Sequence, residues 1–161
     1  MPARTPQAWK MPPIAKVYEA IGAIGDDRVR IHDARRARVV SSDGGRIYEV
    51  EISADGREIS SNDNASYWQG YLGYPAIAVM IARGLYRARP DVIEALRGVP
   101  WKELNTRFHN DYERTLAEVM RRAEAKGFDP DAIRDETEAV LTAVRKAAPM
   151  RGPRRRPPAE A

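Results

Sequence analysis

The stretch ARVVSSDGGRIYEVEISADGREIS, residues 37–60, decides the fold class of this chain. Apolar and polar residues alternate along it, and β-branched residues flank turn sequences at 42–45 and 55–56. Between the turns, the alternation points Tyr48 and Val50 toward a core, while the glutamates beside them face water. The stretch therefore predicts strands joined by tight turns, which is typical of an antiparallel sheet.

Helical patterns lie on both sides of this stretch. Upstream, apolar residues recur every three or four positions over residues 13–25. Downstream, helices are expected from Pro75, over 90–96, from Pro100 and from the capping pair Asp129–Pro130. We therefore expect an α+β fold, in which a small antiparallel sheet of three to four strands is flanked by helices and followed by a C-terminal helical dimerisation region.

The last two expected helices are amphipathic. The helix from Pro100 carries a continuous apolar row as far as Val119, and a short connection leads to the next helix. The pair can fold back as a hairpin or extend as a zipper-like arm. We favour the arm and a homodimer, because the core ahead of these helices looks complete. The expected dimerisation residues are Leu116, Val119, Ile133, Val140, Leu141 and Val144.

A length of 161 residues fits one domain with an appendage. Prolines near the start predict an extended lead-in, and prolines with arginines near the end predict a tail without fixed structure. The expected organisation is a flexible lead-in over residues 1–12, an α+β nucleic-acid-binding domain over 13–100, the helical dimerisation region over 101–148 and a disordered basic tail over 149–161.

Composition argues against several classes of protein. The chain has no cysteine, which excludes disulfides and thiolate ligands, and its two histidines have no partners at metal-site or catalytic spacing. We therefore expect no enzyme, no catalytic residue, no metal and no cofactor. Without a long apolar run or a signal sequence, we expect a cytoplasmic protein that does not associate with membranes. Few Asn and Gln beside many charged residues are typical of a thermophile.

The positive charge is clustered. The net charge is +4, and three runs of arginine occur, at residues 28–38, 83–89 and 151–156. One run alone indicates a solvated face, but three in a small chain favour a polyanionic partner such as nucleic acid. The candidate phosphate contacts are Arg28, Arg30, Arg35, Arg36 and Arg38.

The segment YWQGYLGYP, residues 67–75, holds four large aromatic residues and two glycines in a chain that is only 7% aromatic. Each base stacked on such a ring contributes about 1 to 3 kcal/mol without reading sequence. Glycines beside the rings would let a ligand approach the backbone. The rings could equally fill the core between sheet and helices. The candidate stacking residues are Tyr67, Trp68, Tyr71 and Tyr74.

Two segments, GYLGYPAIA at 70–78 and GVPWKELN at 98–105, resemble the ThermoDBP family of single-stranded-DNA-binding proteins from hyperthermophilic archaea. The resemblance spans about residues 13–147. It implies an α+β domain with a cleft for single-stranded DNA, an aromatic floor, a basic rim and a C-terminal leucine-zipper-like dimer, acting in DNA replication, repair or recombination. The chain departs from the family in its C-terminal apolar stripe, which uses Val, Ile and Tyr as much as Leu.

Residues 47–84 also resemble the scaffold of SWIM-type zinc fingers. Ser60, Asn62, Ala76 and Ala78 stand where metal ligands would be expected, so such a scaffold would be metal-free. The leading prediction is sequence-independent binding and protection of single-stranded DNA. The alternatives are an RNA-binding or ribosome-associated protein, or a protein-interaction adaptor on the metal-free scaffold.

Overall fold

The computed structural model describes residue 5 and residues 7–158. The elements follow one another in this order: α1 (Ala15–Gly25), β1 (Val29–Ile31), β2 (Arg36–Val40), β3 (Ile47–Ile52), β4 (Glu58–Ser61), the π-helical turn η1 (Ala65–Gln69), α2 (Tyr74–Ala82), α3 (Pro90–Leu96), α4 (Trp101–Arg107), α5 (Tyr112–Ala125), α6 (Pro130–Ala147) and β5 (Met150–Arg151).

The expected α+β class is confirmed, with one more strand than expected. The five strands lie in the order β1-β2-β3-β4-β5, and the first four form antiparallel pairs. Gly44 and Gly56 take positive φ in the two expected turns. Strand β5 pairs in parallel with β4, with Met150 opposite Glu58. The segment expected to be a tail without structure thus supplies an edge of the sheet.

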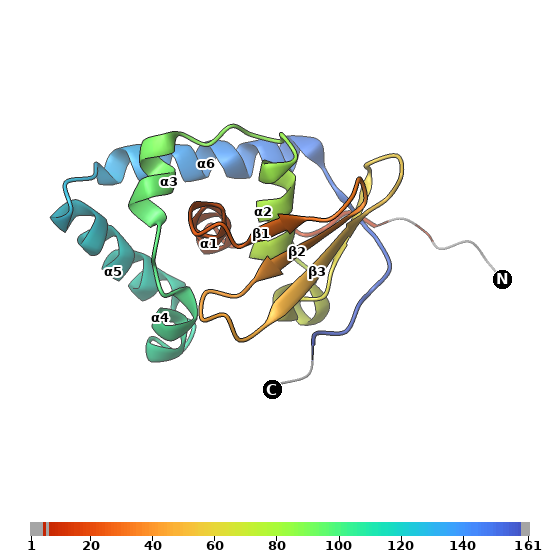
Figure 1. The fold of residues 1–161 in the computed structure, drawn as a ribbon, viewed down its shortest axis with the longest axis horizontal. Helices are drawn as coiled ribbons and strands as arrows, with labels where there is room; N and C mark the ends of the chain where they lie inside the picture. Colours follow the sequence, from red (N-terminus) through yellow and green to blue (C-terminus); the bar gives the residue numbers. More distant parts are fainter. Residues whose placement is uncertain (1–4, 6, 159–161) are drawn as a thin grey trace.

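Only one face of the sheet is covered by helices. Ala37, Val39 and Val50 are buried on that face, and α2 packs between it and α1. On the other face, Arg38 and Glu49 are exposed. Figure 1 shows the helices gathered on one side of the strands. The sheet therefore leaves a polar surface open, as antiparallel sheets commonly do.

Helix α1 is the central element of the helical side. All but two of its residues, Lys16 and Ile24, are buried, including the carboxylate-bearing Glu19. A helix buried on all sides lies inside a core rather than on a surface. In Figure 1, α1 stands in the middle, surrounded by α3, α5, α6 and the sheet with α2. The apolar residues expected at 13–25 therefore form the centre of the molecule.

The single long helix expected from Pro100 is wrong, because the chain breaks it into α4 and α5. His109 and Asn110 both take left-handed backbone conformations, with φ of 52° and 61°. Asp111 then caps α5 by accepting a hydrogen bond from the amide of Arg114. The apolar row continues across the break, which is why the sequence pattern conceals it.

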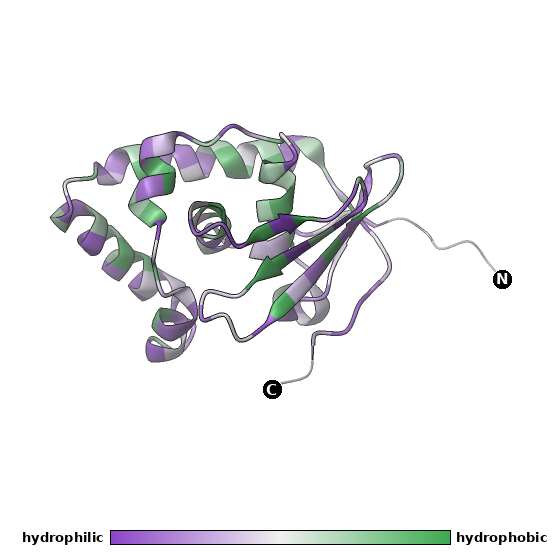
Figure 2. Ribbon diagram, in the orientation of Figure 1, coloured by the Kyte–Doolittle hydropathy of each residue, from purple (hydrophilic) through white to green (hydrophobic). Residues whose placement is uncertain are grey.

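Helices α5 and α6 form neither a closed hairpin nor a free arm. They diverge from the turn at residues 126–129 (Figure 1), and α6 packs against α1 and α3. Figure 2 shows both helices banded by apolar and polar residues. Four expected dimerisation residues lie buried in the chain's own core: Val119, Ile133, Val140 and Val144. Leu116 and Leu141 are only partly buried. Homodimerisation stays a prediction, and it cannot use the four buried residues.

The two terminal segments of the described chain pack together. Trp9, only 8% exposed, donates its amide to the carbonyl of Pro149 and its indole N–H to the carbonyl of Ile59. Residues 7–12 were expected to be a flexible lead-in, whereas Trp9 belongs to the core. The rest of the expected lead-in, residues 1–4 and 6, and residues 159–161 of the tail lie outside the described residues. None of the helices formed by the described residues has the length and apolar character that spanning a bilayer requires.

Candidate nucleic-acid interface

A cleft of about 590 Å³ opens between α1, the β2–β3 hairpin, the segment from η1 to α2, and the α4–α5 break. Four of the chain's seven tyrosines line it, together with four cations, and we call it the tyrosine cleft. The tyrosines are Tyr48, Tyr71, Tyr74 and Tyr112, and the cations are Lys16, Arg28, Arg46 and Lys102.

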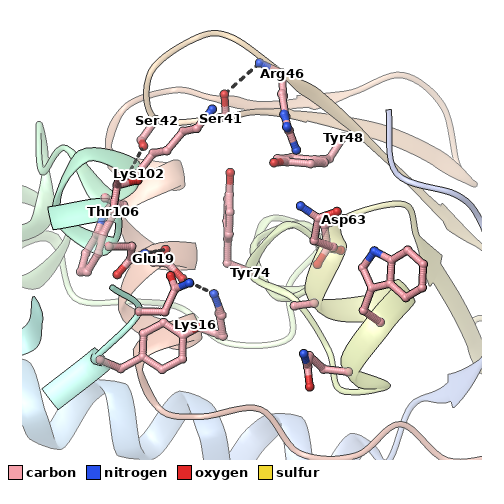
Figure 3. A pocket seen from close by; sticks show the side chains of 18 of the residues that line it. Lys16, Glu19, Ser41, Ser42, Arg46, Tyr48, Asp63, Tyr74, Lys102 and Thr106 are labelled. Atoms are coloured by element: carbon pink, nitrogen blue, oxygen red, sulfur yellow. Dashed lines mark hydrogen bonds and ion pairs between the residues drawn. The ribbon is translucent and has the colours of Figure 1, made fainter. Parts of the chain in front are cut away.

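Tyr74 stands in the middle of the tyrosine cleft. Figure 3 shows its ring between Tyr48 and Lys16, with side chains of α1, the β2–β3 hairpin and α4 around it. Tyr48 meets Tyr74 edge to face, with 6.1 Å between ring centroids. Burial raises the pKa of Tyr74 above its ordinary range and raises the pKa of Tyr71 to about 12. The phenols therefore stay neutral at physiological pH, so the rings bring no negative charge to the cleft.

The inner end of the cleft holds a buried ion pair. The Lys16 ammonium lies 3.1 Å from a carboxylate oxygen of Glu19, and Asn105 donates its side-chain amide to the other oxygen at 2.8 Å. Burial alone would lower the pKa of Lys16, but the charge of Glu19 raises it above the ordinary value. Lys16 also lies over the ring of Tyr112, 4.8 Å from its centroid. This cation is thus fixed in place and stays charged.

Arg28 and Lys102, two of the cations that line the cleft, are held in place by neighbouring groups. The Arg28 guanidinium donates to the carbonyl of Val40 at 2.7 Å, pairs with Asp26 at 3.3 Å and lies 5.9 Å from the ring centroid of Tyr74. Lys102 pairs with Asp43 at 3.0 Å. Two acids, Glu19 and Asp63, also line the cleft. Among the lining residues cations outnumber acids, while Asp26 and Asp43, the partners of Arg28 and Lys102, lie outside the lining. The cleft thus offers ring faces and N–H donors to an anionic ligand.

Asp63 organises the aromatic segment. Its carboxylate accepts hydrogen bonds from the hydroxyls of Ser61 and Ser66, at 2.6 and 2.7 Å. A Cβ atom at Gly73 would lie 1.9 Å from the same carboxylate, so only glycine lets the backbone pass there. Gly70 takes a φ of 73°, which favours glycine. The glycines therefore serve the chain's own packing, and the expectation that they make room for a ligand is not needed to explain them.

Trp68 is the most exposed of the large apolar side chains. It lies on η1 with 68% of its surface accessible, and its ring meets Tyr67 edge to face at 4.7 Å between centroids. A tryptophan in edge-to-face contact with one neighbouring ring keeps at least one face free for stacking. Trp68 thus forms a rim of the tyrosine cleft that is open to solvent.

Comparison with known proteins places the chain in a family. A family model described as "Uncharacterised conserved protein UCP014422" matches residues 9–149. The chain belongs to this family. The match includes the whole lining of the tyrosine cleft and all of α1 to α6, and it ends just before β5. No curated protein and no solved structure matches the chain.

The UCP014422 fold brings together four of the expected site residues and separates the others. Trp68, Tyr71, Tyr74 and Arg28 line the tyrosine cleft. Tyr67 faces a neighbouring groove, under the guanidinium of Arg154. The remaining expected arginines, Arg30, Arg35, Arg36 and Arg38, line a groove of about 940 Å³ on the open face of the sheet, which we call the sheet groove.

Acids neutralise most of the arginines in the sheet groove. Arg36 pairs with Asp33 at 3.0 Å. Arg38 pairs with Glu49 at 3.5 Å, and Arg35 pairs with Glu51 at 3.7 Å. No Phe, Tyr or Trp ring lines this groove among the described residues. Consecutive arginines in the sequence therefore do not form the basic rim of the tyrosine cleft, and strand alternation with cross-strand pairing explains why.

Among the tyrosines and cations that line the tyrosine cleft, sequence reasoning missed five: Lys16, Arg46, Tyr48, Lys102 and Tyr112. They come from separate segments, so no local pattern marks them. One signal was available, because the chain has seven tyrosines and only two phenylalanines. A core that needed only apolar rings would not favour the phenol in this way. Within the described part of the chain, no three His, Asp or Glu residues converge as a metal site would require.

Proposed function

We propose that this protein binds single-stranded DNA in the tyrosine cleft, with little preference for sequence. The observation that carries the proposal is the convergence of four tyrosine rings and four cations on one cleft of about 590 Å³. Rings stack on bases of any identity, and fixed cations attract phosphates. The choice of single-stranded DNA among nucleic acids follows the resemblance of residues 70–78 and 98–105 to the ThermoDBP family.

The rings favour a single strand, because they can stack only on bases whose faces are exposed. In a duplex, bases stack on one another and expose only their edges, whereas a single strand exposes whole base faces. The rings of Tyr48 and Tyr74 lie nearly perpendicular, at 87°, so one ring can offer a face while the other supports it from the side. Trp68 offers another face at the rim. The cleft therefore favours splayed bases.

The test compares affinities over a range of salt concentrations for single-stranded DNA, duplex DNA and RNA of one sequence. We expect the tightest binding with single-stranded DNA, and an affinity that falls as salt rises. Tighter binding of RNA would favour the RNA-binding alternative. The absence of any mobility shift at low salt would contradict the proposal and favour the protein-interaction adaptor.

Trp68→Ala probes the stacking directly. The side chain is 68% exposed, so its loss leaves the core intact. We expect single-strand affinity to fall by about 5-fold to 150-fold, which corresponds to about 1 to 3 kcal/mol for one stacked base. Ile47→Ala is the matched control, because Ile47 is 50% exposed and lies in the sheet groove. Equal affinities of Trp68→Ala and the parent protein would place stacking elsewhere.

Within this proposal, the protein coats and protects single strands in the cytoplasm during DNA replication, repair or recombination, as the ThermoDBP resemblance implies. It would do so as a homodimer whose contact includes Leu116 and Leu141, the two expected interface residues that are not fully buried. Sedimentation of the free protein tests the oligomeric state. A monomer at all concentrations would contradict dimerisation and leave the DNA-binding proposal standing.

A further inference from the structure

A second groove, of about 620 Å³, lies where the two terminal segments of the described chain meet. Ala8 and Met150 form an antiparallel bridge, and the amide of Arg151 donates to the carbonyl of Gln7 at 2.6 Å. These contacts hold residues 7–10 beside residues 149–152. We call this site the terminal groove.

Aromatic rings also line the terminal groove. Trp9, Tyr67 and Trp68 line it. The guanidinium of Arg154 lies 4.0 Å from the ring centroid of Tyr67 and donates to the Tyr67 carbonyl at 2.9 Å. A guanidinium stacked on a ring keeps its remaining N–H groups directed outward, where phosphate oxygens can accept from them. The groove therefore combines the exposed ring of Trp68 with an ordered phosphate donor, Arg154.

Charge distinguishes the terminal groove from the other two. Lys10, Arg151, Arg154 and Arg155 line it, and none of the described residues in its lining is Asp or Glu. Arg155 does form an ion pair with Glu51, which lies outside the lining. Lys10 and Arg154 are exposed. The terminal groove is thus the most strongly basic of the three sites, and it suits a polyanion better than a neutral or cationic ligand.

The terminal groove and the tyrosine cleft are neighbours that share a wall. Trp68 and Gln69, at the end of η1, line both sites. Because Trp68 is 68% exposed, a ligand in one site can contact its ring and continue into the other. Rings and cations of the two sites thus meet at the end of η1.

We infer that the terminal groove is a second subsite for the same single strand. The strand leaves the tyrosine cleft, stacks a base on Trp68 and continues between the terminal segments, where Lys10 and Arg154 bind its phosphates. The C-terminal arginine segment is then part of the binding surface and lengthens the site. This inference rests on the proposed function, because it extends a strand already bound in the tyrosine cleft.

The test uses the double variant Lys10→Gln/Arg154→Gln with a short single strand of about 4 nucleotides and a long one of about 16, the range of single-fold sites. For the long strand, we expect the slope of log affinity against log salt to become shallower by about 1.4, because each lost phosphate contact accounts for about 0.7. For the short strand, we expect the slope and the affinity to match those of the parent protein.

The matched control is Arg107→Gln/Arg134→Gln, which removes the same charge from exposed positions on α4 and α6 that line neither groove. Equal effects of the two double variants on the long strand would overturn the inference and indicate a general effect of charge. An unchanged slope in Lys10→Gln/Arg154→Gln would overturn it as well. A loss on the short strand as large as on the long one would make the terminal groove the primary site, against the order inferred. Failure of the parent protein to bind either strand would instead reject the proposed function.

Discussion

A single indole contact shapes the wall behind the tyrosine cleft. Trp101 is 3% exposed and begins α4, and its ring nitrogen faces Gly22 of α1. A Cβ atom at Gly22 would lie 2.6 Å from that nitrogen, closer than any ordinary contact. The absence of a side chain at Gly22 therefore lets α4 approach α1 and bring Lys102 to the cleft.

Gly22→Ala should lower the free energy of unfolding by about 1 to 3 kcal/mol, because the new methyl group overpacks a filled core. Denaturation by urea measures the change. In a Trp101→Phe background the indole nitrogen is gone, so the same substitution should cost clearly less. An equal cost in both backgrounds would show that the Gly22–Trp101 contact is not the cause.

The buried pair at the inner end of the cleft gives a second prediction at this scale. Lys16→Met leaves the Glu19 carboxylate, which is 4% exposed, without its counter-charge. We expect a loss of about 3 to 5 kcal/mol in the free energy of unfolding. Adding Glu19→Gln should restore part of it, because the amide can still pair with Asn105. If the double variant were as unstable as Lys16→Met, uncompensated charge would not explain the loss.

At the scale of elements, the sequence predicted elements that depend on local signals. It did not predict an element that depends on pairing between distant segments. The helix over 90–96 and the capped start at Asp129–Pro130 match α3 and α6, because capping residues act on their own neighbours. The strand β5 has two residues and exists only through its pairing with β4, so no local pattern marks it. For the same reason, the sequence predicted only part of the lining of the tyrosine cleft. Its contiguous aromatic segment was visible, whereas Tyr48 and Tyr112 reach it from elsewhere in the chain.

The break between α4 and α5 can be tested with one glycine. His109 has a φ of 52° and is exposed, so glycine should relieve backbone strain there. We expect His109→Gly to raise the thermal unfolding midpoint, whereas Glu103→Gly, at an exposed position inside α4, should lower the free energy of unfolding by about 1 kcal/mol. If both substitutions were destabilising to the same degree, the continuous helix predicted by the apolar row would be the better description.

For the whole molecule, the placement of acids decides where uncompensated positive charge lies, which the net charge of +4 does not show. The sheet groove sets its arginines against Asp33, Glu49 and Glu51, and the tyrosine cleft contains Glu19 and Asp63. The lining described for the terminal groove contains no acid. Of the three sites, the terminal groove therefore has the largest excess of cations over acids in its lining, and the exposed ring of Trp68 belongs to that lining.

The tyrosine cleft also makes the whole fold less stable at alkaline pH. Burial raises the pKa of Tyr48 and Tyr74 and brings that of Tyr71 to about 12, above the ordinary value of 10.0. The folded state thus binds these protons more tightly than the unfolded state does. This contribution is complete below pH 10 and is lost as pH rises through about 12. Stability curves followed by tyrosinate absorbance should show the decline, and Tyr71→Phe should flatten it. A decline just as steep in Tyr71→Phe would contradict the assignment to that phenol.

The pairing of Trp9 with Pro149 has a consequence for how the protein is made. The ribosome synthesises Trp9 long before Pro149 and β5, on the order of ten seconds earlier at typical elongation rates. During that interval the edge of β4 has no neighbour, and the indole that will donate to Ile59 has no place among ordered strands. A nascent chain thus exposes an unpaired β edge, which other chains can join, until translation reaches residues 149–151. Slow or stalled synthesis before this point would prolong the exposure of this edge.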